Sequence, residues 1–259
     1  MLVRHKLPFN HWLLDIYSID LKPHVDSHII VPNGYSYILC IAKNKVSINS
    51  KNITKDTIAC FKPTQKVVSI DCHKPTTVIV AKCIPTYAGY IINNEQKRIY
   101  NLNHLISSKH SRWSKQLFNS NSDLYLRIQL FNSILSQLNF KTIHKTILDN
   151  IVLYIHACKG KISIKELTQR YSCSARYIQK QFKSIIGITP KVYLNLAKLY
   201  YTLLELEITI KSEADVTILN YYYDHSHFSK TVKSLLGVSY SKYKSSKSNL
   251  TSVLLCEDY

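Results

Sequence analysis

The sequence predicts an α+β protein in which a strand-rich N-terminal part is followed by an all-helical C-terminal part. Short runs rich in Val, Ile, Tyr and Thr dominate residues 28–92, whereas apolar residues recur at helical spacing after residue 93. In the helical part, a pattern of helix, short turn and helix occurs twice, about fifty residues apart. We therefore expect a small β-barrel or sandwich, a helical linker, and a C-terminal domain with two helix-turn-helix units.

The expected strands lie in segments rich in β-branched and aromatic residues, separated by clusters of Pro, Gly, Asn and Lys. Short strands divided by such turns are typical of a small all-β unit. The segments are Val31–Ile41, Lys45–Asn49, Lys66–Cys72 and Thr76–Ile84.

An amphipathic helix is expected over Asp123–Asn139, because its apolar residues follow one another at steps of four and three. Two interpretations remain open. The stripe packs on its own domain, or it pairs two protomers in a homodimer. The residues of this dimerisation stripe are Leu124, Ile128, Phe131, Leu135 and Leu138.

Capping residues mark the first helix-turn-helix unit, which follows a helix that Gly160 ends. Ser163 is placed to cap the unit's first helix, with Glu166 at the capping-box distance. Residues 171–173 form a short turn, and Ser174 is placed to cap a second helix that runs to about Ile185.

The second helix of this unit has two different faces. Ile178 and Phe182 fall on one side, where they meet Leu167 of the preceding helix. Long polar and cationic side chains occupy the other side, and such a face suits the major groove of DNA. Judged alone, an ordinary solvated helix face explains the segment as well. The outward residues are Arg176, Gln179, Lys180 and Lys183.

The pattern returns in a second unit, joined to the first by a helix from Pro190 to about Leu206. Residues 182–193 align with residues 232–243, matching Lys, Ser, Gly and Tyr, and such a repeat rarely arises by chance. Two units held about 34 Å apart reach successive major grooves on one face of a duplex. Phe228, Val232 and Leu235 point inward, and the outward residues are His225, Ser226, Ser229, Lys230 and Lys233.

These motifs resemble the DNA-binding domain of the AraC/XylS family of bacterial transcription regulators. SARYIQKQFK at 174–183, followed by GITP at 187–190, is similar to the family's first unit. DHSHFSK at 224–230, followed by GVS at 237–239, is similar to its C-terminal signature. By this resemblance, DNA contacts come from Tyr177, Gln179, Lys180, His225, Ser226, Ser229 and Lys230.

The resemblance also carries expectations for the rest of the chain. Family members of this length pair the DNA-binding half with a cupin-like β domain and a dimerising helix, and activation through contact with RNA polymerase is the commoner role. Such a β domain either holds a small effector or serves only in dimerisation. Lys22, Lys62 and Lys82 are candidates to bind a carboxylate effector, with solvated lysines as the simpler interpretation.

The second unit departs from the family pattern. Glu213, Thr217 and Tyr221 stand where the family usually has Ile, Ala and Gly, and Lys198 stands for Arg in the linking helix. A bulky residue at a left-handed glycine position costs about 1 kcal/mol or more. We therefore predict that the first unit reads most of the DNA sequence and that the second unit binds more weakly.

The net charge of +18 favours a polyanionic partner, because Lys and Arg release condensed counterions when they neutralise phosphates. Nucleic acid comes first and an anionic membrane surface second. No apolar run approaches the roughly 20 residues that span a bilayer, so we expect no membrane segment. The seven cysteines form no CxxC pair, and residues 1–9 lack a signal-peptide stretch, which together predict a cytoplasmic protein with free thiols.

The sequence carries no signature of an enzyme. Its five glycines form no GxGxxG, Walker A or GxSxG motif, and HExxH is absent. His24, His28 and His73 lack the spacing and the acidic partner of a metal site. We expect no catalytic residues, no metal and no cofactor.

The expected organisation is a β-rich regulatory domain at 1–100, a helical linker or dimerisation segment at 101–141, a DNA-binding domain at 142–248 and a tail at 249–259. The expected function is sequence-specific regulation of transcription on double-stranded DNA, as an activator. The alternative is an accessory protein that heterodimerises with a related regulator and binds no specific DNA itself.

Overall fold

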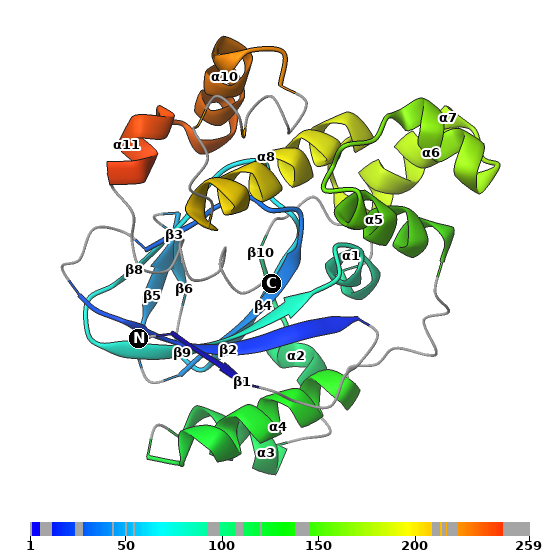
Figure 1. The fold of residues 1–259 in the computed structure, drawn as a ribbon. Coiled ribbons are helices and arrows are strands. Elements are labelled where there is room, and N and C mark those ends of the chain that lie inside the picture. Colours follow the sequence, from blue (N-terminus) through cyan, green and yellow to red (C-terminus); the bar gives the residue numbers. More distant parts are fainter. Residues whose placement is uncertain are drawn as a thin grey trace. The chain divides into compact units, whose positions relative to one another are not determined.

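The structure is a computed structural model, and it divides the chain into two compact units. The N-terminal unit comprises Met1–Ser27, Tyr35–Lys62 and Ser69–Thr146, and the C-terminal unit comprises His28–Gly34, Pro63–Val68 and Ile147–Tyr259. The predicted α+β class is confirmed, with sheets in the first part of the chain and helices in the last (Figure 1). The described residues are 2–5, 12–23, 28–42, 44–49, 51–53, 55–92, 99–106, 111–119, 121–137, 146–208, 213, 216 and 222–245.

The strands form two sheets (Figure 1). The larger sheet has the order β1-β2-β9-β4-β7-β10, with β1 (Leu2–His5), β2 (Leu13–Leu21), β9 (Thr76–Cys83), β4 (Ser36–Ile41), β7 (Thr57–Phe61) and β10 (Ile99–Asn101). The smaller sheet has the order β3-β8-β5-β6, with β3 (His28–Ile30), β8 (Val68–Cys72), β5 (Val46–Ile48) and β6 (Lys51–Ile53).

The centre of the larger sheet is apolar on both faces. Ile38 on β4 and Ile79 on β9 lie on one face and Leu39 and Val80 on the other, and each is at most 1% exposed. Strands buried on both faces have near-continuous apolar runs, which is why β4 and β9 are recognisable in the sequence. The expected strand segments do not include β1, β2, β6, β7 or β10. Polar residues such as Asp15 and Ser18 interrupt the apolar run of β2, and its partner β9 is distant in the sequence.

The helices of the N-terminal unit include the predicted amphipathic helix. They are α1 (Tyr87–Ile91), α2 (Asn103–Ile106), α3 (Ser111–Phe118) and α4 (Leu124–Gln137). On α4, Ile128, Phe131 and Leu135 are each 0% exposed, and Leu124 is half-buried. Helix α4 contacts α3 within the same unit.

Three residues of the stripe on α4 therefore pack inside their own unit, and the pairing of two protomers through α4 stays a prediction. Ile128, Phe131 and Leu135 are not exposed to a second protomer in this structure. Leu138 lies outside the described residues. Tyr125 and Leu126, which the sequence analysis did not select, are the large apolar side chains of α4 that remain exposed.

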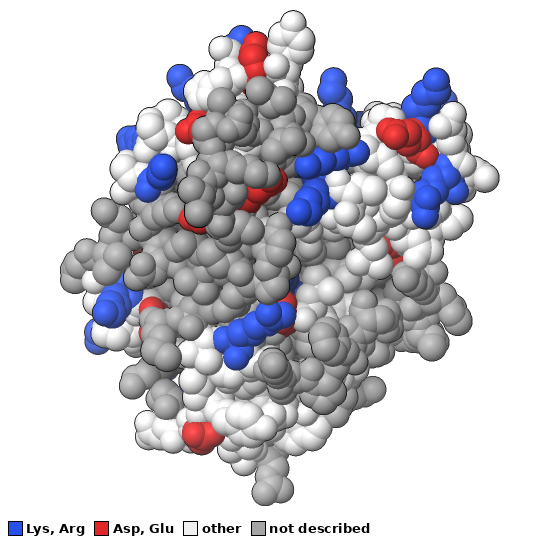
Figure 2. Space-filling model, in the orientation of Figure 1, with Lys and Arg blue, Asp and Glu red and all other residues white. Residues whose placement is uncertain are grey.

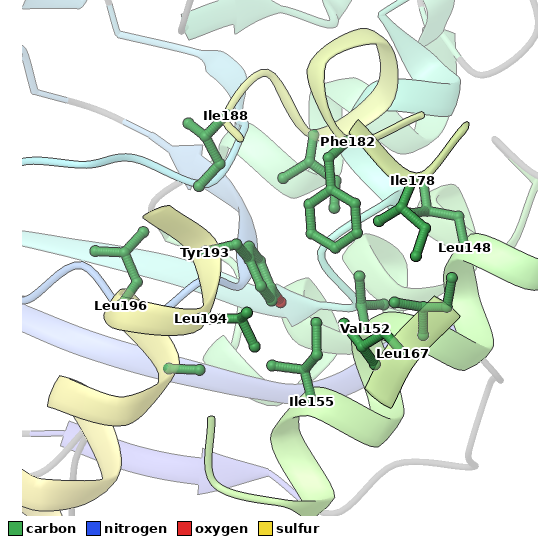
Figure 3. Packing of buried hydrophobic residues seen from close by; sticks show 13 residues of the cluster. Leu148, Val152, Ile155, Leu167, Ile178, Phe182, Ile188, Tyr193, Leu194 and Leu196 are labelled. Atoms are coloured by element: carbon green, nitrogen blue, oxygen red, sulfur yellow. The ribbon is translucent and has the colours of Figure 1, made fainter. Parts of the chain in front are cut away.

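The C-terminal unit consists mainly of helices (Figure 1). They are α5 (Ile147–Ala157), α6 (Ile164–Tyr171), α7 (Ala175–Gln181), the π-helical turn η1 (Phe182–Ile186), α8 (Pro190–Ile208), α10 (His225–Leu236) and α11 (Tyr240–Ser245). Figure 3 shows apolar side chains of α5, α6, α7, η1 and α8 meeting in one core. Among the described helices, none is both long and apolar enough to cross a membrane.

Candidate nucleic-acid interface

Two capped helices position the first unit. The hydroxyl of Ser163 accepts a hydrogen bond from the backbone N–H of Glu166, and the Glu166 carboxylate accepts one from the Ser163 backbone N–H, which confirms the predicted capping box. The carboxylate of Glu166 accepts hydrogen bonds from the hydroxyl and from the backbone N–H of Ser163, which hold the pKa of Glu166 below its usual value. Ser174 caps α7 in the same way, through the N–H of Tyr177. Between the helices, Ser172 has a left-handed backbone with a φ of 48°.

The inner face of α7 is anchored in the core. Ile178 and Phe182 are each 0% exposed, and they share a cluster with Leu167 of α6 (Figure 3). The ring of Phe182 packs edge-on against Tyr193 of α8, with centroids 5.4 Å apart. The position of α7 is therefore fixed by α6 on one side and by α8 on the other.

The outer face of α7 presents the residues that the sequence predicted. Arg176, Gln179, Lys180 and Lys183 are exposed. Tyr177, which its position beside Ile178 made a candidate for partial burial, is 40% exposed. Within the described part of the chain, Arg176, Lys180 and Lys183 make no ion pair. Their positive charges are therefore available to an external anion.

The end of the first recognition helix differs from the prediction. A continuous helix was expected to about Ile185, but the chain widens into η1 at Phe182, and the N–H of Gly187 bonds to the carbonyl of Phe182. Gln181 and Phe182 keep regular α-helical angles, so the change of winding affects the residues after Lys183, up to Gly187.

The second predicted recognition helix, α10, likewise has a capped N-terminus, a buried face and an exposed face. Asp224 caps it by accepting a hydrogen bond from the N–H of His227 at 2.6 Å. Phe228 and Val232 are each 0% exposed, as predicted, whereas Leu235 is half-buried and Leu236 takes the buried position. The predicted outward residues His225, Ser226, Lys230 and Lys233 are exposed, and Ser229 is half-buried.

One outward residue of α10 is held by a partner. Nε2 of His225 lies 2.7 Å from a carboxylate oxygen of Glu213, and Nδ1 lies 3.4 Å from the hydroxyl of Ser229. Glu213 is one of the residues that depart from the family pattern. The other two, Thr217 and Tyr221, lie outside the described residues.

Helix α8 links the two helix-turn-helix units of the C-terminal unit, since α5 and α10 both contact it. With 19 residues at a rise of 1.5 Å per residue, α8 is about 28 Å long. His156 of α5 meets the hydroxyls of Tyr193 and Tyr201 of α8, at 2.7 Å and 3.2 Å. Between these two tyrosines, Nζ of Lys198 lies 4.4 Å from the ring centroid of Tyr222, and partial burial lowers the pKa of Lys198.

Tyr223 is a residue that the sequence analysis missed. It is 92% exposed and directly precedes Asp224, the N-cap of α10. A large exposed aromatic residue beside the N-terminus of a recognition helix is placed where side chains contact DNA. Its position immediately before the capping residue is the sequence feature from which an exposed tyrosine at this helix end can be predicted.

Basic side chains lie over both helix-turn-helix units. Figure 2 shows Lys and Arg over α6 and α7 and again over α10 and α11, which Figure 1 locates. Arg176 and Lys180 belong to α7, Lys183 belongs to η1, and Lys230 and Lys233 belong to α10. Among the described residues, no group of His, Cys, Asp and Glu is arranged to hold a metal ion.

Comparisons with known proteins relate this chain to two bacterial proteins. No protein-family model matches the chain. The Transposon Tn10 TetD protein of Escherichia coli is 21% identical over 117 residues, which are 45% of this chain and 85% of TetD.

Solved structures of ToxT from Vibrio cholerae, an AraC-family regulator, match nearly the whole chain. ToxT of strain O395 superposes with a TM-score of 0.53 and 13% identity, covering 90% of this chain and 98% of ToxT. ToxT of strain SCE256 with a bound unsaturated fatty acid superposes with a TM-score of 0.50 and 15% identity, covering 95% of this chain and 99% of ToxT. The likeness shows that this chain shares their fold, as the resemblance in its C-terminal motifs predicted.

Proposed function

We propose that this chain is a regulator of transcription, rather than an enzyme, that binds double-stranded DNA with α7 and α10 in successive major grooves. The observation that carries the proposal is the outer face of α7. Arg176, Gln179 and Lys180 are exposed on a helix that its own core holds in place. Side chains of this kind hydrogen-bond to base edges and phosphates.

The linking helix α8 supports the same proposal. Helices α5 and α10 both contact it, so the two helix-turn-helix units belong to one compact unit. Two such units on one chain suit successive major grooves, which are about 34 Å apart on one face of B-DNA. The fold shared with ToxT and the partial match to TetD support a regulator of the AraC/XylS type. We further propose an activator that contacts RNA polymerase, in the cytoplasm of a bacterium.

The test is the affinity of the full chain for the DNA upstream of its own coding sequence, compared with a scrambled duplex over a salt series. We expect a preference of at least about 100-fold for the native DNA, since specific and non-specific affinities differ by about 10³ to 10⁷ in such proteins. The apparent affinity should fall steeply with salt on both duplexes. Equal affinities that only follow the salt concentration would instead favour the accessory protein that heterodimerises with another regulator.

We also propose that the N-terminal unit takes a carboxylate effector. ToxT is known with a bound unsaturated fatty acid. Among the three candidate lysines, Lys22 is exposed, whereas Lys62 and Lys82 are 8% and 2% exposed. Nζ of Lys82 lies 4.1 Å from the ring centroid of Tyr35. A buried ammonium group in an apolar sheet is a strong partner for a carboxylate, because the low dielectric strengthens their attraction.

Melting of the full chain with an unsaturated fatty acid tests this second proposal. We expect the acid to raise the Tm by at least about 3 °C, and its methyl ester to have little effect, because binding to the native state adds stability. Lys82→Met should remove most of the rise, whereas the exposed Lys22→Met should keep it. Equal responses of the two variants would exclude Lys82 as the carboxylate partner.

A further inference from the structure

The contact between Glu213 and the second recognition helix assigns a role to a residue that the DNA-binding motif does not include. The side chains of Glu213 and His225 are 36% and 61% exposed, so their hydrogen bond lies at the surface and not in the core. His225 and Ser229 are four residues apart on α10 and therefore share one face. Both are residues that the resemblance assigns to DNA contact.

The direction of the hydrogen bonds follows from the chemistry of the groups. An ionised carboxylate only accepts, so Nε2 of His225 must carry the proton that it donates to Glu213 at 2.7 Å. When the ring is neutral, Nδ1 then accepts, and the hydroxyl of Ser229 is the donor of that 3.4 Å contact. The donors of both residues are thus directed to partners within the protein and away from a base or a phosphate.

The charge of Glu213 acts in the same direction. It lies beside a helix whose exposed Lys230 and Lys233 would otherwise attract phosphates. A carboxylate within a Debye length of about 8 to 10 Å of the DNA backbone repels it and offsets one of these cations. An apolar residue at this position, as the resemblance leads one to expect, has neither effect.

We propose that Glu213 is a negative determinant of DNA affinity, which holds His225 and Ser229 back from DNA and thereby leaves most of the binding to the first unit. This inference rests on the proposed function. It explains in physical terms how the second unit differs from the first, where Arg176 and Lys180 have no acidic neighbour in an ion pair among the described residues.

The test compares the full-length protein with its Glu213→Gln variant on native and scrambled duplexes over a salt series. Glutamine keeps an acceptor for His225 but removes the charge. We expect about three- to tenfold tighter binding to both duplexes and a salt dependence that is steeper by up to about one in the log–log slope. Glu213→Ala, which also releases His225, should increase the DNA affinity by at least the same factor. Adding His225→Ala to Glu213→Ala should remove part of this increase in affinity. Asp71→Asn makes the same change of charge in the N-terminal unit and should alter affinity less than twofold.

Each outcome has one meaning. If Glu213→Gln and Asp71→Asn bind alike while the wild type prefers its native duplex, the proposed function stands and this inference is wrong. If Glu213→Gln binds the native duplex more weakly, Glu213 accepts a hydrogen bond from a base, which also overturns it. If neither the wild type nor any variant binds a duplex, the proposed function fails together with the inference. Matching circular dichroism spectra and melting curves ensure that the variants are folded.

Discussion

Replacing Gly160 with alanine is expected to destabilise the C-terminal unit by about 2 to 5 kcal/mol. Gly160 follows α5 with a φ of +72°, a left-handed conformation that costs other residues about 1 to 2 kcal/mol. A Cβ atom there would lie 2.5 Å from the backbone N of Lys198 and 2.8 Å from the carbonyl O of Leu194. These are backbone atoms of α8 and cannot rotate away, so forcing the helices apart adds a further 1 to 3 kcal/mol.

Gly237 provides the matched control for this prediction. It ends α10 with a φ of +76°, but a Cβ atom there would meet nothing within 4 Å. Gly237→Ala should therefore lower the stability only by the cost of a left-handed backbone at alanine, about 1 to 2 kcal/mol. Hydrogen exchange of the amides of α5 and α8 measures the loss locally, which suits a chain of two units that need not unfold together. Equal losses for the two variants would show that the close approach of α5 and α8 is unimportant.

The sequence was most informative where structure is decided by neighbouring residues. Ser163, Glu166 and Ser174 were identified as caps, and each makes the expected hydrogen bond, because capping depends on residues only three apart. The apolar positions Ile178 and Phe228 were likewise correct, since helical period alone determines which face they occupy. The fold class follows from the same local signals.

Contacts between distant residues were beyond the reach of this reasoning. The period of Ile128 and Phe131 predicts a stripe but not the surface that covers it, and only the structure places the stripe inside its own unit. Strand β2 was missed because its pairing with β9 depends on residues far along the chain, such as Ile16 opposite Ala81. In the candidate site, the bond between Glu213 and His225 depends on the path of the chain between them. No spacing rule describes that path.

Lys180→Ala is expected to lower the affinity for native DNA by about fivefold to 150-fold, which corresponds to about 1 to 3 kcal/mol. Lys180 lies one turn after Arg176 on the exposed face of α7, and the N-terminal turns of a recognition helix approach the base edges. Because a base contact distinguishes sequences, affinity for the scrambled duplex should fall less. The preference for the native duplex should therefore shrink.

Lys183→Ala separates base reading from general charge attraction. Lys183 lies in η1, beyond the N-terminal turns of the recognition helix that approach base edges, so we assign it to a phosphate. Its removal should weaken binding to both duplexes by the same factor and reduce the salt slope by about one. Lys74→Ala removes an exposed charge of the N-terminal unit and should change affinity less than twofold. If Lys180→Ala changes the affinity as little as Lys74→Ala does, α7 does not enter the groove. If Lys180→Ala instead weakens binding to both duplexes equally, as expected for Lys183→Ala, α7 binds DNA without reading its sequence.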